Sequence, residues 1–196
     1  EMEEKLLAGN APFSLASPYR ARCAAYKRHD RSIEFFRRLA AQHPEDVRAR
    51  IELACAFIDK IPTCGGMAAI VSKGTLARQS LDELDRVIAE NPDLWVAYYC
   101  RGMNHLHWPR ALKHSDAAAA DFRECLRIQR SRRAGTDPPE RPLSKGGGER
   151  TFIGLGDSYA KAGEAGKARD AWREGLKAFP ESVALKERLA IGDDAA

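Results

Sequence analysis

Small and bulky apolar residues recur along this chain at the three- and four-residue spacing that places side chains on one face of a helix. In four places a small residue is followed four positions later by a bulky apolar residue, and three positions further on by another apolar or small residue. The pattern predicts an all-α chain whose core is formed by one face of each helix. The four sets are Ser32, Phe36 and Leu39; Ser80, Leu84 and Val87; Ala118, Phe122 and Cys125; and Ala168, Trp172 and Gly175.

Three prolines separate these helices from the ones that follow. Pro44, Pro92 and Pro180 each come after a helical pattern, and each is followed by an acidic residue and then by a restart on an apolar residue. Proline ends a helix because it has no backbone N–H to donate, and acidic side chains favour a helix N-terminus. The sequence therefore predicts pairs of helices that are joined by short connections.

The clearest pair of helices lies near the C-terminus and matches a known repeat. Its first helix contains Phe152, Leu155, Gly156 and Tyr159, and its second contains Ala168, Trp172 and Gly175 before Pro180. This spacing resembles a tetratricopeptide repeat, running over 34 residues from Glu149 to Ser182. Three earlier units match more loosely. The resemblance implies a right-handed superhelical array of antiparallel helix pairs, a tetratricopeptide-repeat-like α-solenoid, with a C-terminal capping helix.

The whole chain can be divided on this basis without a second domain. An N-terminal segment, 1–12, precedes one domain at 13–196. That domain contains four repeat units, an insertion between the two helices of the second unit, a linker loop and a capping helix. The units are 13–46, 47–94, 95–132 and 149–182; the insertion is 60–75, the linker loop 133–148 and the capping helix 183–193.

The resemblance also implies a binding surface, because the first helices of such repeats line the concave wall of the array. The residues expected there are mostly apolar, which favours a partner helix or peptide with an apolar face. The first interpretation is therefore a non-catalytic protein-interaction or scaffold module. An open alternative is that the N-terminal segment or the insertion covers this groove. The expected groove residues are Ile51, Cys55, Ile58, Tyr99, Met103, Leu106, Ile153 and Asp157.

A second interpretation is a small-molecule or metal-binding accessory protein. Its pocket would form between loop 60–75 and segment 100–116, which hold turn-forming glycines and a group of polar and aromatic residues. Metal binding is not expected, since His105 and His107 point about 200° apart on a helix. The weak metal candidates are Cys100, His105, His107 and His114, and the pocket candidates are Cys64, Gly65, Gly66, Lys73, His107, Trp108 and Arg110.

Catalysis and nucleic-acid binding are both disfavoured. No phosphate loop, His-Glu-x-x-His or Cys-x-x-Cys motif is present, so no enzyme activity and no cofactor are expected. The net charge is +4, but 19–38 carries seven basic residues against two acidic ones, and 127–150 seven against three. Neither stretch is accompanied by an aromatic or glycine-rich nucleic-acid motif, so solvated helix faces explain them better.

The cellular compartment is predicted from three features that the sequence does not show: a transmembrane segment, a signal peptide and a disulfide framework. No apolar run approaches the roughly 20 residues of a transmembrane helix. Residues 1–7 are acidic and do not resemble a signal peptide, although an upstream segment removed by processing stays open. Five irregularly spaced cysteines favour reduced thiols over a disulfide framework. These features together predict a cytoplasmic protein.

Overall fold

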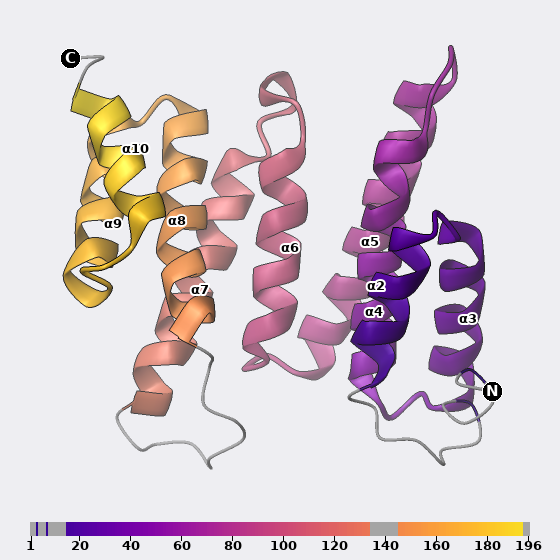
Figure 1. Ribbon diagram of the computed structural model, residues 1–196. Coiled ribbons are helices and arrows are strands. Elements are labelled where there is room, and N and C mark those ends of the chain that lie inside the picture. Colours follow the sequence, from indigo (N-terminus) through magenta and orange to yellow (C-terminus); the bar gives the residue numbers. More distant parts are fainter. Residues whose placement is uncertain (1–2, 4–6, 8–14, 134–144, 194–196) are drawn as a thin grey trace. The chain divides into compact units, whose positions relative to one another are not determined.

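A computed structural model describes Glu3, Leu7 and residues 15–133 and 145–193, and these residues form helices joined by short connections (Figure 1). No strand occurs in these ranges, which confirms the predicted all-α class. The chain divides into two compact units, Glu1–Pro92 and Asp93–Ala196. This division lies close to the predicted boundary between the second and third repeats. None of the described helices is both long and apolar enough to span a membrane.

Unit 1 is a stack of helices in which each packs against the next. α3 contacts α4, α4 contacts α5, and α2 lies against both α3 and α4. Its core contains Phe36 and Leu39 of α3 together with Leu53 and Phe57 of α4. The elements are α2 (Ala16–Ala25), α3 (His29–Gln42), α4 (Val47–Lys60), a short 3₁₀ turn η2 (Ile61–Thr63) and α5 (Ala69–Glu90).

Unit 2 repeats this arrangement. α6 packs on α7, α7 on α8, α8 on α9, and α9 on α10, while α6 also contacts α8. Its core includes Phe122, Leu126, Trp172 and Leu185. The elements are α6 (Trp95–His107), a 3₁₀ turn η3 (Arg110–Leu112), α7 (Ser115–Arg133), α8 (Lys145–Ala162), α9 (Ala165–Ala178) and α10 (Val183–Asp193).

The four sets of residues predicted to form the core are all buried. Glycines allow close approach between helices in unit 2. A Cβ atom at Gly156 of α8 would lie 2.1 Å from Nε1 of Trp172 in α9, and one at Gly154 would lie 2.4 Å from Cζ of Phe122 in α7. These positions have no room for a side chain, so the helices pack backbone against aromatic ring.

One predicted loop is shorter than expected. Insertion 60–75 is predicted to be a loop between two helices, but α5 begins at Ala69 and includes its second half. No proline interrupts the chain between Pro62 and Pro92, and Gly74 has open space around it, so the helix extends beyond the core. Ile70 and Val71 on this extension are exposed.

The structure describes the predicted capping helix, but only parts of the predicted linker loop and N-terminal segment. α10 covers the expected capping helix and packs on α9. α7 extends to Arg133 and α8 begins at Lys145, so helical residues occupy both ends of the predicted linker loop, 133–148. Residues 134–144 lie outside the described residues, as does all of the N-terminal segment 1–12 except Glu3 and Leu7.

Candidate functional site

In unit 2, α6 and α8 contact each other and carry partly exposed apolar residues. Tyr99, Met103 and Leu106 are spaced by four and three residues along α6, which places them on one face. They and Ile153 of α8 pack on the unit 2 core but keep part of their surface exposed. We call Tyr99, Met103, Leu106 and Ile153 the α6–α8 face.

Tyr99 is fixed by aromatic contacts on its inner side. Its ring stacks on Trp95 with the centroids 4.9 Å apart and the planes 12° from parallel. It also meets Phe122 edge-on, at 6.0 Å between centroids. Burial raises the pKa of Tyr99, and the nearby Arg150 opposes this rise. The phenol therefore stays neutral and presents a rigid surface.

Asp157, expected on the same groove wall, is engaged in an ion pair. Its two carboxylate oxygens accept from Nε and Nη2 of Arg188 in α10, at 2.6 and 2.7 Å. The hydrogen bond to Asp157 raises the pKa of Arg188, so the guanidinium remains charged. The pair connects α8 to α10 and places charges beside the apolar residues.

The C-terminal end of α6 is held by a cation from α8. Nζ of Lys161 donates to the carbonyl oxygens of Leu106 and Trp108, at 2.5 and 2.6 Å. These carbonyls lie at a helix end, where no backbone N–H is available to bond them. Lys161 therefore satisfies acceptors that α6 cannot satisfy within itself.

Three of the metal and pocket candidates in unit 2, His105, Trp108 and His114, form a compact group of rings. The ring of Trp108 stacks on His114 at 4.4 Å, and its Nε1 donates to Oδ1 of Asn104. The Nδ1 atoms of His105 and His114 are 2.7 Å apart, so one ring donates and the other accepts. His107 points elsewhere, with Nδ1 2.6 Å from the carbonyl oxygen of Met103.

The candidate metal ligands do not come together as a metal site. In the part of the chain that the structure describes, no group of three or more His, Cys, Asp or Glu residues is placed to hold a metal ion. Cys100 is half-buried on α6, and the His105–His114 pair supplies only two nitrogen ligands.

In unit 1 the expected groove residues lie on α4 and differ in exposure. Ile51 is buried, so it presents almost no surface to a partner, while Cys55 and Ile58 are half-buried. On the neighbouring α2, Nε of Arg20 donates to Oε2 of Glu52 at 2.7 Å. The same guanidinium pairs with Asp59.

The pocket predicted between loop 60–75 and segment 100–116 draws on both units. In unit 1, Cys64 is half-buried, with Sγ 3.8 Å from the carbonyl oxygen of Lys60, while Gly65 and Gly66 are exposed. Lys73 is exposed on α5, and Arg110 of unit 2 is exposed at η3. Each half is described within its own unit, so the combined pocket stays a prediction.

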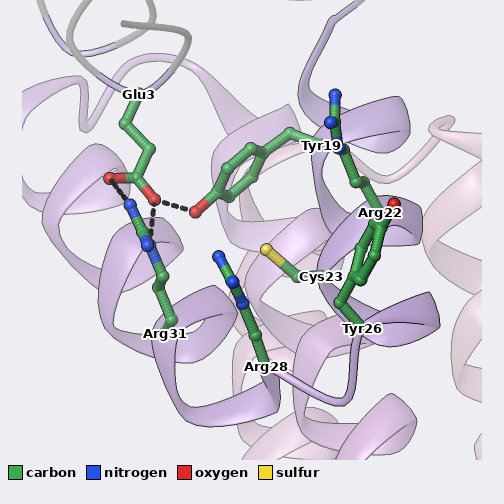
Figure 2. Close-up of a pocket in the computed structure, with 7 residues that line it drawn as sticks. All are labelled: Glu3, Tyr19, Arg22, Cys23, Tyr26, Arg28 and Arg31. Atoms are coloured by element: carbon green, nitrogen blue, oxygen red, sulfur yellow. Dashed lines mark hydrogen bonds and ion pairs between the residues drawn. The ribbon is translucent and has the colours of Figure 1, made fainter.

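One group of residues has no counterpart among the sequence predictions. A cavity of about 440 Å³ in unit 1 is lined by residues from α2, the α2–α3 turn, α3 and the N-terminal segment. No periodic signal connects Glu3 with Arg31, and the charge pattern of 19–38 favours solvated helix faces. The lining residues, drawn in Figure 2, are Glu3, Tyr19, Arg22, Cys23, Tyr26, Arg28 and Arg31.

Comparison with known proteins identifies the fold. No protein-family model matches the chain, and no curated protein matches it either. Among solved structures, the chain is similar to TTC0263, a thermophilic tetratricopeptide repeat protein of Thermus thermophilus. The TM-score is 0.66 and the identity 16%, over 88% of this chain and 77% of that one.

Two MamA structures give the same result. One MamA protein matches with a TM-score of 0.61 and 13% identity over 92% of this chain and 80% of its own. MamA 41-end from Desulfovibrio magneticus RS-1 matches with a TM-score of 0.60 and 15% identity over 93% and 84%. The chain therefore has the fold of tetratricopeptide repeat proteins, as its resemblance implied.

Proposed function

We propose that this protein is a non-catalytic interaction module that binds a partner helix or peptide on the α6–α8 face. The observation that carries the proposal is the exposure of this face. Tyr99, Met103, Leu106 and Ile153 each pack on the core with one side and keep the other side accessible. Apolar side chains gathered on adjacent helices are suited to burying the apolar stripe of an amphipathic helix.

The surroundings of the face favour a partner with both apolar and charged residues. The Asp157–Arg188 pair lies on the α8 side, and Arg150 is exposed one turn before Ile153. Interfaces commonly combine an apolar centre with a polar rim that directs the partner. An amphipathic segment with acidic residues on its flank would meet both features.

The charged groups near this face also support a role without catalysis. Asp157 is bound by Arg188, and Lys161 donates to two backbone carbonyls. A general acid or base must exchange a proton with a substrate, and groups held in structural bonds are poorly placed to do so. These contacts are better explained as connections between helices.

Affinity capture from the source cell, followed by mass spectrometry, tests the proposal with matched variants. The test variant is Met103→Gln with Ile153→Gln, which introduces two amides into the α6–α8 face. The control is Leu112→Gln, which makes the same kind of change at an exposed apolar residue of η3. We expect the wild type and the control to enrich the same partner, and the double variant to lose at least about tenfold of it.

Retention of that partner by the double variant would contradict the proposal. Circular dichroism melting of all three proteins shows whether a lost partner reflects a lost fold. Cross-linking from a photoreactive residue at Met103, but not at Leu112, would place the partner on the face directly.

A further inference from the structure

The cavity in unit 1 already contains a carboxylate. Nε of Arg31 donates to Oε1 of Glu3 at 2.7 Å, and Nη2 donates to Oε2 at 3.2 Å. The hydroxyl of Tyr19 donates to Oε1 as well. Figure 2 shows these three side chains pointing toward one another. A guanidinium fork and a phenol therefore form a three-donor site that matches the planar shape of a carboxylate.

The cavity has more positive charge than Glu3 neutralises. Arg22 and Arg28 line it together with Arg31, and neither forms an ion pair with any residue that the structure describes. Arg22 lies over the ring of Tyr26, 6.0 Å from its centroid. Three guanidinium groups against one carboxylate leave room, in charge as well as in volume, for further acidic groups.

The local fold explains why these cations gather. α2 ends at Ala25, and Lys27 adopts a left-handed conformation with φ 55°, so that the chain reverses before α3 begins at His29. The backbone N–H groups of Lys27 and Arg28 donate to the last carbonyls of α2. This tight turn brings Arg28 beside Cys23, and Figure 2 shows its side chain projecting into the same space.

The charged state of the bound carboxylate follows from these contacts. The hydrogen bond from Arg31 holds the pKa of Glu3 below its ordinary value of 4.5. Burial and the hydrogen bond to Glu3 raise the pKa of Tyr19, so its hydroxyl remains a donor. Glu3 therefore occupies the site as an anion at neutral pH.

We propose that this cavity is a binding site for an acidic peptide segment of a partner protein, in which a partner carboxylate replaces Glu3. The group now bound there, the side chain of Glu3, is itself a carboxylate on a peptide chain. The two remaining arginines, Arg22 and Arg28, can bind a second acidic residue. Glu3 then acts as a competitor within the chain. The site is formed by residues of unit 1 and the α6–α8 face by residues of unit 2, so this proposal goes beyond the function proposed above.

A peptide is favoured over other anions by the shape of the site. The fork of Arg31 bonds two oxygens in one plane, as a carboxylate presents them, and Tyr19 adds its bond to one of those oxygens. The walls include the aromatic ring of Tyr26 and the thiol of Cys23, which suit the carbon chain of a side chain. Cavities of several hundred Å³ are of the size that small ligands and side chains fill.

The test measures binding of fluorescein-labelled hexaglutamate to the full chain by fluorescence anisotropy at fixed ionic strength. Glu3→Gln removes the competing charge but keeps an oxygen for the Tyr19 hydroxyl. We expect this variant to bind the probe about tenfold more tightly than the wild type, because a competitor on the same chain has a high effective concentration. Labelled hexaglutamine should bind neither protein.

Three second substitutions in the Glu3→Gln background locate the site. Arg31→Gln should weaken binding about tenfold, as expected for the loss of a charge-assisted pair of hydrogen bonds. Arg28→Gln should weaken it by a smaller factor, and it removes a side chain that forms no ion pair with the described residues. Arg38→Gln is the matched control, since it removes the same charge from an exposed position on α3 outside the cavity. It should leave the affinity within about twofold.

Four outcomes would overturn the proposal. The first is that wild type and Glu3→Gln bind the probe with equal affinity, and the second is that Arg38→Gln weakens binding as much as Arg31→Gln. The third and fourth are that inorganic phosphate or oligothymidylate displaces the probe more readily than free hexaglutamate does. The Met103→Gln and Ile153→Gln variant should bind the probe as the wild type does, so failure here is separable from failure of the α6–α8 face.

Discussion

α2 of unit 1 and α8 of unit 2 contact their neighbouring helices in different ways. In unit 1, Arg20 of α2 reaches across to Glu52 and Asp59 of α4, and Ser17 also bonds Glu52. In unit 2, α8 presents Gly154 and Gly156 to the rings of Phe122 and Trp172. Unit 2 also contains ion pairs, such as Arg188 with Asp157, but the glycine contacts with aromatic rings are described only in unit 2.

This difference shows that the same pattern of paired helices can be held by two kinds of contact, which respond differently to added volume and to the loss of a charge. Close packing fails when a single methyl group is added, but it is indifferent to salt and pH. A partly buried ion pair tolerates small changes in volume, but it fails when one partner is removed and the other charge is left unbonded.

The largest expected effect tests the packing in unit 2. Gly156→Ala would place a Cβ 2.1 Å from Nε1 of Trp172, so the indole ring or α8 must shift. We expect the free energy of unfolding to fall by about 2 kcal/mol, since overpacking outweighs the gain in helix propensity. Chemical denaturation monitored by Trp fluorescence and circular dichroism measures this change.

The matched control for this change is Gly166→Ala, at an exposed position of α9 with nothing within 4 Å of the new Cβ. It should leave stability unchanged or raise it by up to about 1 kcal/mol. An equal loss in both variants would mean that the contact with Trp172 is not the cause.

A smaller effect tests the charge network in unit 1. Arg20→Gln leaves the buried carboxylate of Glu52 without its guanidinium partner, and we expect a loss of about 1 to 2 kcal/mol in urea denaturation. Arg86→Gln is the control, because Arg86 is exposed and its ion pair is with Glu83, one turn away on the same helix. It should change stability by no more than about 0.5 kcal/mol. Equal effects would show that the Arg20 network contributes no more than a surface pair.

The smallest effect is a pH dependence from Glu3. Its pKa is lowered in the folded protein, chiefly by the hydrogen bond from Arg31, so its contribution to stability is present above 4.5 and is lost as pH falls through the folded value. Glu3 is partly exposed, which limits this contribution to less than about 1 kcal/mol. The melting temperature of wild type should exceed that of Glu3→Gln at pH 7, and the difference should shrink toward pH 3. A difference that grows in acid would contradict this ionic contact.

Periodic features of the fold could be predicted from the sequence, because helical spacing is a local property of neighbouring residues. Spacing alone assigns Phe36, Leu84, Phe122 and Trp172 to the core, and all four are buried. Gly156 and Trp172 both belong to the repeat-like spacing, and the structure packs one against the other.

Contacts between residues that are distant in the sequence leave no such periodic pattern, so they could not be predicted. Arg31 and Glu3 are separated by 28 positions, and Arg20 and Asp59 by 39. Side chains of this kind look equally suited to solvent until the fold brings a partner near them. The same limit applied to the expected groove, where the spacing of Ile51 and Asp157 gave no sign that one is buried and the other ion-paired.

The bond from Lys161 has a consequence for how unit 2 loses its structure. Since the ammonium group comes from α8 and satisfies the carbonyls at the end of α6, the final turn of α6 depends on a residue more than 50 positions later. Fraying of α6 and detachment of α8 should therefore occur as one event. Amide hydrogens in these two segments are then expected to exchange with solvent at closely similar rates.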